Sequence, residues 1–155
     1  MIDLSDLIRP EAVAEGMAAA SKKALLQQLA GLAAAAYGLD AKVAADALNA
    51  REKLGSTGFG GGIAIPHARL SGIESILGVV ARLSRPVDFA SVDDLPVDLV
   101  VVLFSPVDAG ADHLKALARV SRALRDPGFV AKLRGAGSRD ALYALMVGDE
   151  ARDAA

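Results

Sequence analysis

One run in the chain has no polar face, because the residues from Leu99 to Phe104 are all aliphatic or aromatic. The run is far shorter than the ~20 residues that cross a bilayer. Together with Val97 and Asp98 it predicts a β-strand that is apolar on both sides, as the central strand of a covered sheet is. A second β-rich segment spans residues 76–83. We therefore expect an α/β fold in which helices cover both faces of a sheet.

Two helices that form a hairpin are predicted ahead of these strands. Ser21 is a candidate N-cap for a helix whose apolar residues recur at helical spacing, and Gly38 stands just beyond its expected end. Asp40 offers a second N-cap, and the helical pattern that follows continues toward Arg51. Gly55 ends that pattern.

Further helices are predicted after the strands. Asp112 is a candidate cap for one helix, Asp126 precedes a proline that starts a short second one, and Ser138 opens the last. This order of helices, sheet and helices, without an internal repeat or a linker, predicts one domain over residues 1–155. We expect the small and polar tail at residues 148–155 to fray.

The composition limits the chemistry that this domain performs. Its 155 residues contain no cysteine and two histidines, so thiol catalysis is excluded and any imidazole chemistry must use His67 or His113. With 53% hydrophobic residues the chain has material for a sizeable core and is not a disordered regulator. The 17 basic and 19 acidic side chains are interspersed, which argues against nucleic acid as a partner. Because the N-terminus does not follow the pattern of a secretion signal, we expect a cytoplasmic protein with no membrane insertion.

The segment from Gly58 to Arg69 combines a glycine cluster with a proline–histidine pair. Pro66 stiffens the entry to His67, and the glycines upstream allow backbone amides to approach an oxygen-rich group closely. This combination indicates a phosphoryl site, although an ordinary turn beside a loop histidine would give the same pattern. The glycine spacing departs from the dinucleotide fingerprint and no Gly-Lys-Ser/Thr triplet occurs, which excludes a Rossmann motif and a P-loop.

His113 and Arg51 are further candidates for binding an anion. His113 follows Asp112 at the start of an expected helix, so it is either a polar residue at a helix end or an imidazole that converges with His67 on one anion. Arg51 stands at the end of the second helix, directly before the glycine segment. It is either a surface residue or a planar fork for phosphate oxygens.

Two charged clusters are interpreted as parts of the solvated surface. The first is a group of aspartates between the two predicted strands, which lack metal-ligand spacing and are expected to be loop and strand-edge charges. These are Asp88, Asp93, Asp94 and Asp98. The second is a basic stripe on one helix, which is expected to face solvent and consists of Lys115, Arg119 and Arg122.

The segment of residues 51–69 resembles the active-site segment of phosphotransferase-system enzyme IIA domains of the mannitol/fructose and nitrogen-regulatory type. Three later segments also resemble that family in the same order, so the resemblance covers residues 4–147. They are Pro86–Phe89, Pro96–Val100 and His113–Leu117. The resemblance implies the enzyme IIA mannitol-type fold, a mixed parallel and antiparallel sheet flanked by helices. It also implies a phosphotransferase component that uses neither a metal ion nor another cofactor.

By motif position, the resemblance implies that His67 accepts a phosphoryl group through Nε2 from the phosphohistidine of an HPr-like carrier protein. A backbone carbonyl would hold its other ring nitrogen and fix the tautomer. His113 and Arg51 would stabilise the phosphoryl oxygens. Hydroxyl and amide groups of the same segment are expected to assist, namely those of Ser56, Thr57, Gly60, Gly61 and Gly62.

The subtype is predicted from what accompanies the domain. A sugar-specific IIA domain is often fused to a IIB domain or works with one and with a membrane permease, and this sequence shows neither a linker nor a transmembrane segment. We therefore expect the nitrogen-regulatory branch, in which regulatory target proteins read the phosphorylation state. One alternative is a sugar-specific component that passes phosphate to a IIB domain, and another is an interaction module that is not phosphorylated. A metal-dependent or small-molecule enzyme built on the two histidines and Asp112 is a third.

Overall fold

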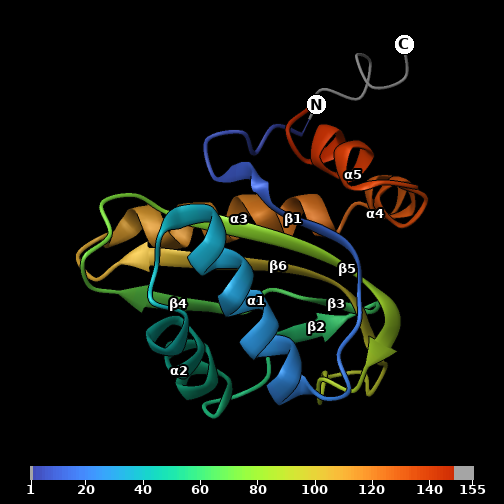
Figure 1. Ribbon diagram of the computed structural model, residues 1–155. Helices are drawn as coiled ribbons and strands as arrows, with labels where there is room; N and C mark the ends of the chain where they lie inside the picture. The colour runs from blue at the N-terminus through green and yellow to red at the C-terminus, as the bar shows by residue number, and fades with distance from the viewer. Residues whose placement is uncertain (1, 149–155) are drawn as a thin grey trace.

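Strand β6 (Val97–Pro106) contains the apolar run and occupies the centre of the sheet, as predicted (Figure 1). The computed structural model describes residues 2–148. Strand β5 (Leu77–Val87) pairs antiparallel with one side of β6. On the other side, β3 (Ile63–Ala64) and β4 (His67–Leu70) follow one another along β6, and both run parallel to it.

Two edge strands complete the sheet. β1 (Ile8–Met17) runs parallel to β5 at one edge, and β2 (Gly58–Gly60) runs antiparallel to β3 at the other. The strand order is β1-β5-β6-β3-β2, and β4 pairs with β6 beyond the end of β3. The sheet is therefore mixed, which confirms the fold that the resemblance implies.

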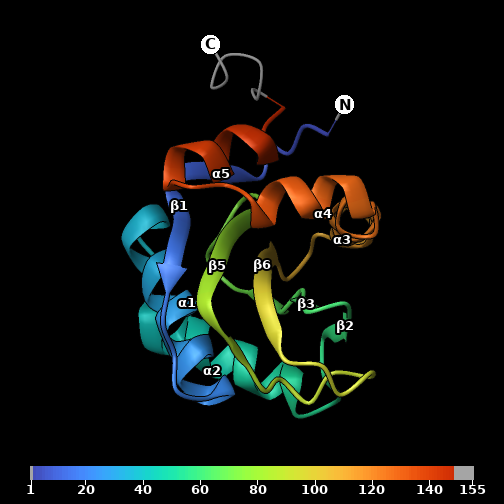
Figure 2. The same cartoon turned by 90° about the vertical axis from the view of Figure 1, so that its right-hand side faces the viewer.

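Successive residues of β6 point to opposite faces of the sheet and enter two separate cores. The odd-numbered residues from Leu99 to Leu103 pack in the core under α3 (Ala111–Leu124), α4 (Pro127–Arg134) and α5 (Arg139–Met146). The even-numbered residues from Val100 to Phe104 pack in the core under α1 (Lys22–Tyr37) and α2 (Ala41–Glu52). Figure 2 shows these two groups of helices on opposite sides of the sheet. Because burial of each large apolar side chain contributes about 1.5–3 kcal/mol, this one strand anchors both layers of helices.

Most of the predicted helix boundaries are confirmed. The side chains of Ser21, Asp40, Asp126 and Ser138 each accept a backbone amide hydrogen in the first turn of their helices. Gly38 follows α1 in the left-handed conformation, where glycine carries no steric cost. The local polar residues therefore define where these helices begin and end.

The element order differs from the prediction at two places. Asp112 is not an N-cap, because α3 already begins at Ala111, and Asp112 lies in the first turn, where an acid interacts favourably with the helix dipole. The chain also begins with a strand, β1, instead of a helix. Arg9, Pro10 and Glu11 of β1 are exposed, and an edge strand of this kind carries no clear alternation of apolar and polar residues.

The remaining boundaries agree with the prediction or extend it. β5 and β6 continue beyond their predicted ends, to Val87 and Pro106. The tail that we expect to fray lies, from residue 149 onward, outside the described residues. Within residues 2–148, every helix is too short or too polar to cross a membrane.

Three elements meet at the carboxyl end of β6. β4 is aligned so that His67 lies opposite Leu103. α2 packs against β4 and carries Arg51 in its last turn, and α3 follows β6 and carries His113 in its first turns. The carboxyl ends of parallel strands are a common place for functional sites in α/β proteins. The fold thus brings together three residues that are far apart in the sequence.

Candidate functional site

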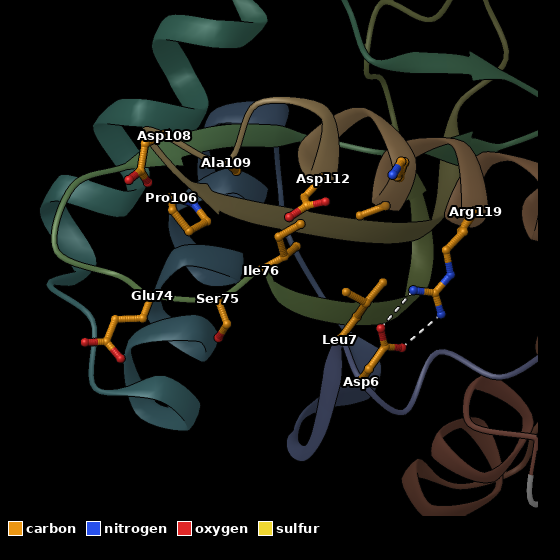
Figure 3. Close-up of a pocket in the computed structure, with 12 residues that line it drawn as sticks. Asp6, Leu7, Glu74, Ser75, Ile76, Pro106, Asp108, Ala109, Asp112 and Arg119 are labelled. Carbon is orange, nitrogen blue, oxygen red and sulfur yellow. Dashed lines mark hydrogen bonds and ion pairs between the residues drawn. The ribbon is translucent and has the colours of Figure 1, made fainter.

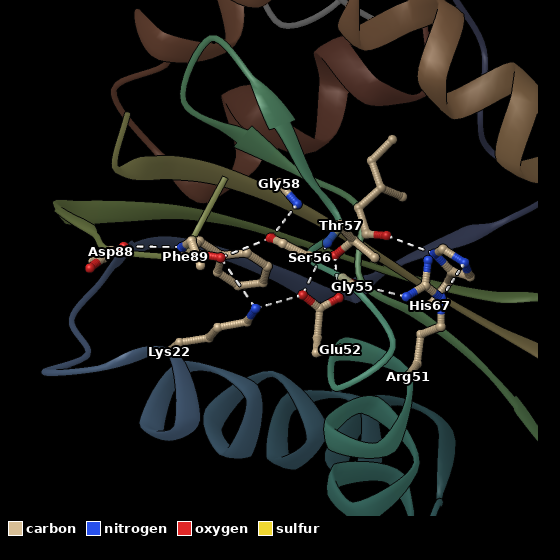
Figure 4. A network of polar contacts seen from close by, with 12 residues as sticks. Lys22, Arg51, Glu52, Gly55, Ser56, Thr57, Gly58, His67, Asp88 and Phe89 are labelled. Carbon is tan, nitrogen blue, oxygen red and sulfur yellow. Dashed lines mark hydrogen bonds and ion pairs between the residues drawn. The ribbon is translucent and has the colours of Figure 1, made fainter. Parts of the chain in front are cut away.

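His67 is held through one ring nitrogen, and this contact defines the state of the other. Its Nδ1 lies 2.9 Å from the carbonyl oxygen of Ile65. A carbonyl oxygen only accepts hydrogen bonds, so Nδ1 carries the proton and Nε2 has the lone pair. Nε2 accepts a hydrogen bond from Nε of Arg51 at 3.3 Å, which agrees with this tautomer (Figure 4). The family resemblance implies that a backbone carbonyl holds the ring nitrogen that does not accept the phosphoryl group, and the Ile65 carbonyl holds Nδ1 in this way.

Arg51 is positioned by the turn that ends α2. Its NH1 donates to the carbonyl oxygen of Gly55 at 2.9 Å. The Arg51 carbonyl accepts from the amide of Leu54 at 3.1 Å, so the turn closes back on the last residues of the helix. A guanidinium group has five N–H donors in one plane. Within residues 2–148, His67 and the Gly55 carbonyl accept from two of them, and the remaining donors are available to an anion.

His113 lies beside His67, with their ring centroids 5.5 Å apart. Its Nδ1 is hydrogen-bonded to the hydroxyl group of Ser105 at 2.6 Å, and both residues are buried. Burial lowers the pKa of His113 below its ordinary value, and the electrostatic influence of the nearby Arg69 guanidinium and His67 ring lowers this pKa further. His113 is therefore a neutral imidazole near pH 7.

A pocket of about 500 Å³ opens over these side chains, and we call it the histidine pocket. Its lining consists of Ala47, Ala50, Arg51, Leu54, His67, Ala68, Arg69 and His113. This part of the described chain contributes two guanidinium groups and no carboxylate to the lining, so the pocket favours an anion. The three residues predicted to act on a phosphoryl group, Arg51, His67 and His113, thus share one pocket.

Arg69 and Ser105 belong to the site but receive no role from the sequence. Arg69 lies two residues after His67 on β4, so both side chains point to the same face of the strand. Its NH1 donates to the carbonyl oxygen of Val107 at 3.3 Å. The spacing of two residues from His67 is a signal that a sequence analysis could use. No local pattern indicates Ser105, because its contact with His113 depends on how α3 folds back over the end of β6.

The hydroxyl groups of Ser56 and Thr57 do not reach the histidine pocket, which corrects the role expected for them. Ser56 Oγ donates to the carbonyl oxygen of Phe89 at 2.8 Å, and Thr57 Oγ1 donates to Oε2 of Glu52 at 2.5 Å. Figure 4 shows both side chains within this second set of contacts. Their donors are therefore committed to the protein and not to an anion beside His67.

The glycine turn, Gly60–Gly62, lies outside the histidine pocket as well, which corrects the expectation that its amides assist. All of its residues have positive φ, and the amide of the middle residue donates to Oδ2 of Asp93 at 2.9 Å. The Gly62 carbonyl accepts a hydrogen bond from the amide of Leu99. His67 lies opposite Leu103, four residues further along β6, which corresponds to about 13 Å at the ~3.3 Å rise of a strand. The cluster of glycines forms a tight turn between β2 and β3.

Three of the four aspartates in this cluster accept hydrogen bonds in turns or form an ion pair, namely Asp88, Asp93 and Asp98. Asp88 accepts a hydrogen bond from the amide of Ala90, and Asp98 pairs with Arg134 at 2.8 Å. The prediction of purely solvated charges is therefore wrong for Asp98. Within residues 2–148, no three histidine, cysteine or acidic side chains are grouped as metal ligands.

The basic stripe on α3 is also not purely a solvent face. Arg119 forms a two-pronged contact with the carboxylate of Asp6, at 2.8 and 2.9 Å (Figure 3). This pair lies at a pocket of about 650 Å³ between the N-terminal segment and α3. Acids outnumber bases among its lining residues, which is the reverse of the histidine pocket. The charged residues of this lining are Asp6, Glu74, Asp108, Asp112, Lys115 and Arg119.

Comparison with known proteins gives a consistent result over almost the whole chain. Residues 6–147 match the family described as phosphoenolpyruvate-dependent sugar phosphotransferase system, EIIA 2. A nitrogen regulatory protein of Bradyrhizobium diazoefficiens is 48% identical over 143 residues, which cover 92% of this chain and 94% of that protein. The family match includes every residue that lines the histidine pocket.

Solved structures show the same fold. The crystal structure of the nitrogen regulatory protein IIA-Ntr from Neisseria meningitidis matches with a TM-score of 0.84 at 31% identity. The match covers 90% of this chain and 96% of that one. The mannitol IIA of Escherichia coli matches with a TM-score of 0.74 over 89% of this chain and 97% of its own, and at 21% identity this similarity concerns the fold alone.

Proposed function

The chain belongs to the phosphoenolpyruvate-dependent sugar phosphotransferase system EIIA 2 family, and from this membership we propose that it is a phosphocarrier of the nitrogen-regulatory IIA kind. In this proposal His67 accepts a phosphoryl group from the phosphohistidine of an HPr-like carrier protein. The observation that carries it is the tautomer of His67. With Nδ1 bonded to the Ile65 carbonyl, the lone pair lies on Nε2, in a pocket lined by positive charge.

The transfer exchanges one phosphorus–nitrogen bond for another. The Nε2 lone pair of His67 attacks phosphorus in line while the bond to the carrier's imidazole breaks, and the departing imidazole keeps the electron pair. The proton on Nδ1 stays hydrogen-bonded to the Ile65 carbonyl, which stabilises the positive charge that develops on the ring. Because donor and acceptor are both imidazoles, the step depends on positioning and on neutralisation of the phosphoryl oxygens.

In this proposal Arg51 supplies positive charge for that neutralisation, and His113 supplies a hydrogen bond. In the unphosphorylated chain Nε of Arg51 donates to Nε2 of His67, so the guanidinium moves from this lone pair to a phosphoryl oxygen as the group arrives. When the Ser105 hydroxyl donates to Nδ1 of His113, the neutral ring carries its proton on Nε2. This N–H then donates a hydrogen bond to a second phosphoryl oxygen. Arg69 adds a further positive charge at the same pocket.

The rim of the histidine pocket supports a protein as the phosphoryl donor. Leu54 lines the pocket and is 84% exposed, and Leu114, next to His113, is 65% exposed. Val107, whose carbonyl accepts a hydrogen bond from Arg69, is also exposed, and we call these three side chains the exposed apolar rim. Large exposed apolar side chains around a polar centre are typical of protein interfaces. An HPr-like carrier that covers them would exclude water from the reacting atoms.

Regulation follows from the change in charge at this surface. A phosphoryl group on His67 adds roughly two negative charges at the centre of the exposed apolar rim. Regulatory target proteins that bind over the rim therefore bind the two states with different affinity. In the sugar-specific alternative, the same phosphoryl group on His67 passes to a IIB domain.

The proposal is tested with phosphoenolpyruvate, enzyme I and an HPr-type carrier in a reconstituted cascade. We expect one acid-labile phosphate per chain, and none on the His67→Ala variant. That variant retains His113 as the one remaining imidazole of the sequence, so it also tests whether the second histidine accepts phosphate. Phosphate on His67→Ala would contradict the assignment, and rapid onward transfer to a IIB domain would favour the sugar-specific alternative.

A further inference from the structure

Glu52 is a buried carboxylate that the phosphoryl chemistry does not use, and it ends α2 directly after Arg51. Its side chain is 4% exposed and accepts hydrogen bonds from the Thr57 amide at 3.1 Å and the Thr57 hydroxyl at 2.5 Å. Lys22 pairs with it at 2.9 Å and also donates to the carbonyl oxygen of Phe89 at 3.2 Å. A buried carboxylate is stable only where such partners replace its hydration. Segments from α1, α2 and two loops thus converge on one side chain (Figure 4).

Thr57 connects Glu52 to His67. The Thr57 carbonyl accepts from the amide of Ile65 at 3.2 Å, and the Ile65 carbonyl accepts from Nδ1 of His67 at 2.9 Å. Ile65 therefore links the two residues, because its amide binds Thr57 and its carbonyl binds His67. Because the second of these bonds selects the tautomer with a lone pair on Nε2, the tautomer depends on where Glu52 fixes Thr57.

The same carboxylate closes the turn that holds Arg51. The two hydrogen bonds between the Glu52 carboxylate and Thr57 join the ends of the turn at residues 52–57. Within this turn, the Gly55 amide donates to the Glu52 carbonyl at 3.1 Å. The Gly55 carbonyl in turn accepts from NH1 of Arg51 at 2.9 Å. A shift of the turn moves this carbonyl and with it the guanidinium.

We propose that Glu52, with Thr57 and Lys22, is the positioning group of the histidine pocket and sets both the tautomer of His67 and the place of the Arg51 guanidinium. This inference rests on the proposed function of His67 as phosphoryl acceptor. Thr57, which the sequence predicts to contact the phosphoryl group directly, acts in this proposal through its contact with Glu52. In-line transfer is sensitive to such placement, because a displacement of about 1 Å lowers a rate by roughly 100-fold.

The variant Thr57→Val tests this inference, since valine keeps the branched shape of threonine and removes the hydroxyl that binds Glu52. We expect the transfer rate at saturating carrier to fall about tenfold, because His67 and Arg51 are held less well. The KM for the carrier is expected to stay within about twofold, because the exposed apolar rim is unchanged. Thr57→Ser keeps the hydroxyl and is expected to retain the rate of the unaltered chain within about twofold.

Nitrogen NMR of the imidazole rings in the unphosphorylated chain gives a readout that a general loss of stability does not move. The sequence has two histidines, so their ring nitrogens are readily assigned. In Thr57→Val we expect the fraction of His67 protonated on Nδ1 to fall, and in Thr57→Ser to return. The exposed ion pair of Lys42 and Asp46 on the same helix gives a matched control, because Asp46→Asn should change neither the rate nor the nitrogen signals.

The inference requires both changes in Thr57→Val. An unchanged rate overturns it, and so does a lowered rate with unchanged nitrogen signals, because Thr57 would then act on the phosphoryl group directly. If Thr57→Val does not fold, Lys22→Met, at a side chain 25% exposed, is judged by the same two measurements. If the unaltered chain takes up no phosphate, the proposed function fails, whereas the nitrogen signals still decide whether the Glu52 contacts set the tautomer of His67.

Discussion

Two polar regions lie along the same side of β6 and differ in whether their hydrogen-bonding capacity is already used. In the histidine pocket, within residues 2–148, Nε2 of His67 accepts one hydrogen bond, from the side chain of Arg51 at 3.3 Å, and in the proposed function a phosphoryl group takes the place of that contact. At the glycine turn, the carbonyl of Gly61 accepts from NH2 of Arg134. The same NH2 donates to Asp98 at 2.8 Å, so this cation is neutralised within the protein.

The glycine turn meets a requirement of the backbone, whereas the histidine pocket meets a requirement for binding. An anion at the glycine turn would have to displace charge-assisted hydrogen bonds that the amide of Gly61 and the side chain of Arg134 already make. An anion in the histidine pocket meets two guanidinium groups and neutral imidazoles, with no carboxylate in the described lining. Glycine-rich sequence therefore indicates a turn with positive φ, and phosphate binding needs donors that the fold leaves unused.

The largest effect is expected on the transfer rate, when Arg51 of the histidine pocket is replaced and the result is compared with replacement of Arg134 at the glycine turn. Arg51→Met removes a guanidinium from the phosphoryl oxygens and should lower the transfer rate about 100-fold, while the free energy of unfolding changes by less than about 1 kcal/mol. Arg134→Met should do the opposite, leaving the rate within about twofold and lowering the free energy of unfolding by about 1 kcal/mol. Rapid-quench phosphorylation and urea unfolding measure the two quantities.

Arg51→Lys serves as the control for charge, since lysine retains the positive charge and lacks the planar fork. We expect its rate to lie between that of the unaltered chain and that of Arg51→Met. A rate loss in Arg134→Met as large as that in Arg51→Met would contradict this difference between the two regions, because it would place the glycine turn in the phosphoryl site.

The features that the sequence predicts well are those set by local chemistry. The apolar run around Val101 specifies a central strand, because its residues are apolar on both faces and each face needs a cover. Ser21 and Asp40 mark helix starts, because a side-chain oxygen there satisfies an amide that would otherwise lack a partner. The assignment of His67, Arg51 and His113 to one site comes from the resemblance to a family and agrees with their placement in one pocket.

The features that the sequence misses depend on tertiary contacts. Thr57 precedes the glycine turn and carries a hydroxyl, but whether this group faces an anion or Glu52 is decided by where α2 ends. The contact of Ser105 with His113 likewise joins a strand end to a helix start across a loop. β1 escapes notice because its exposed residues hide the alternation of a strand. In each case the missing information is a spatial neighbour.

The next largest effect concerns the glycine turn itself and is an effect on stability. A β-carbon added at Gly62, where φ is +80°, would lie 2.7 Å from NH2 of Arg134 and 3.0 Å from Oδ1 of Asp98. Gly62→Ala should therefore lower the free energy of unfolding by about 2 kcal/mol and leave the transfer rate within about twofold. Gly61→Ala is the matched control, because φ there is +67° but no atom lies within 4 Å, so only the backbone strain of about 1 kcal/mol remains. Equal losses of stability in both variants would contradict the role of the ion pair.

The smallest expected effect is on the pH dependence of stability, which should differ between the two regions. The pKa of His113 is lowered in the folded chain, so below its ordinary value of about 6.5 the unfolded chain binds more protons, and the free energy of unfolding decreases as the pH falls. Two backbone amides lower the pKa of Asp93 at the glycine turn, and its contribution is lost only below about pH 4. The free energy of unfolding, measured with urea between pH 3 and pH 8, should therefore lose much of its dependence on pH between about pH 4 and pH 6.5 in His113→Gln and keep it in Asp93→Asn. A slope in that range that persists in His113→Gln would show that the buried imidazole is not the group that titrates there.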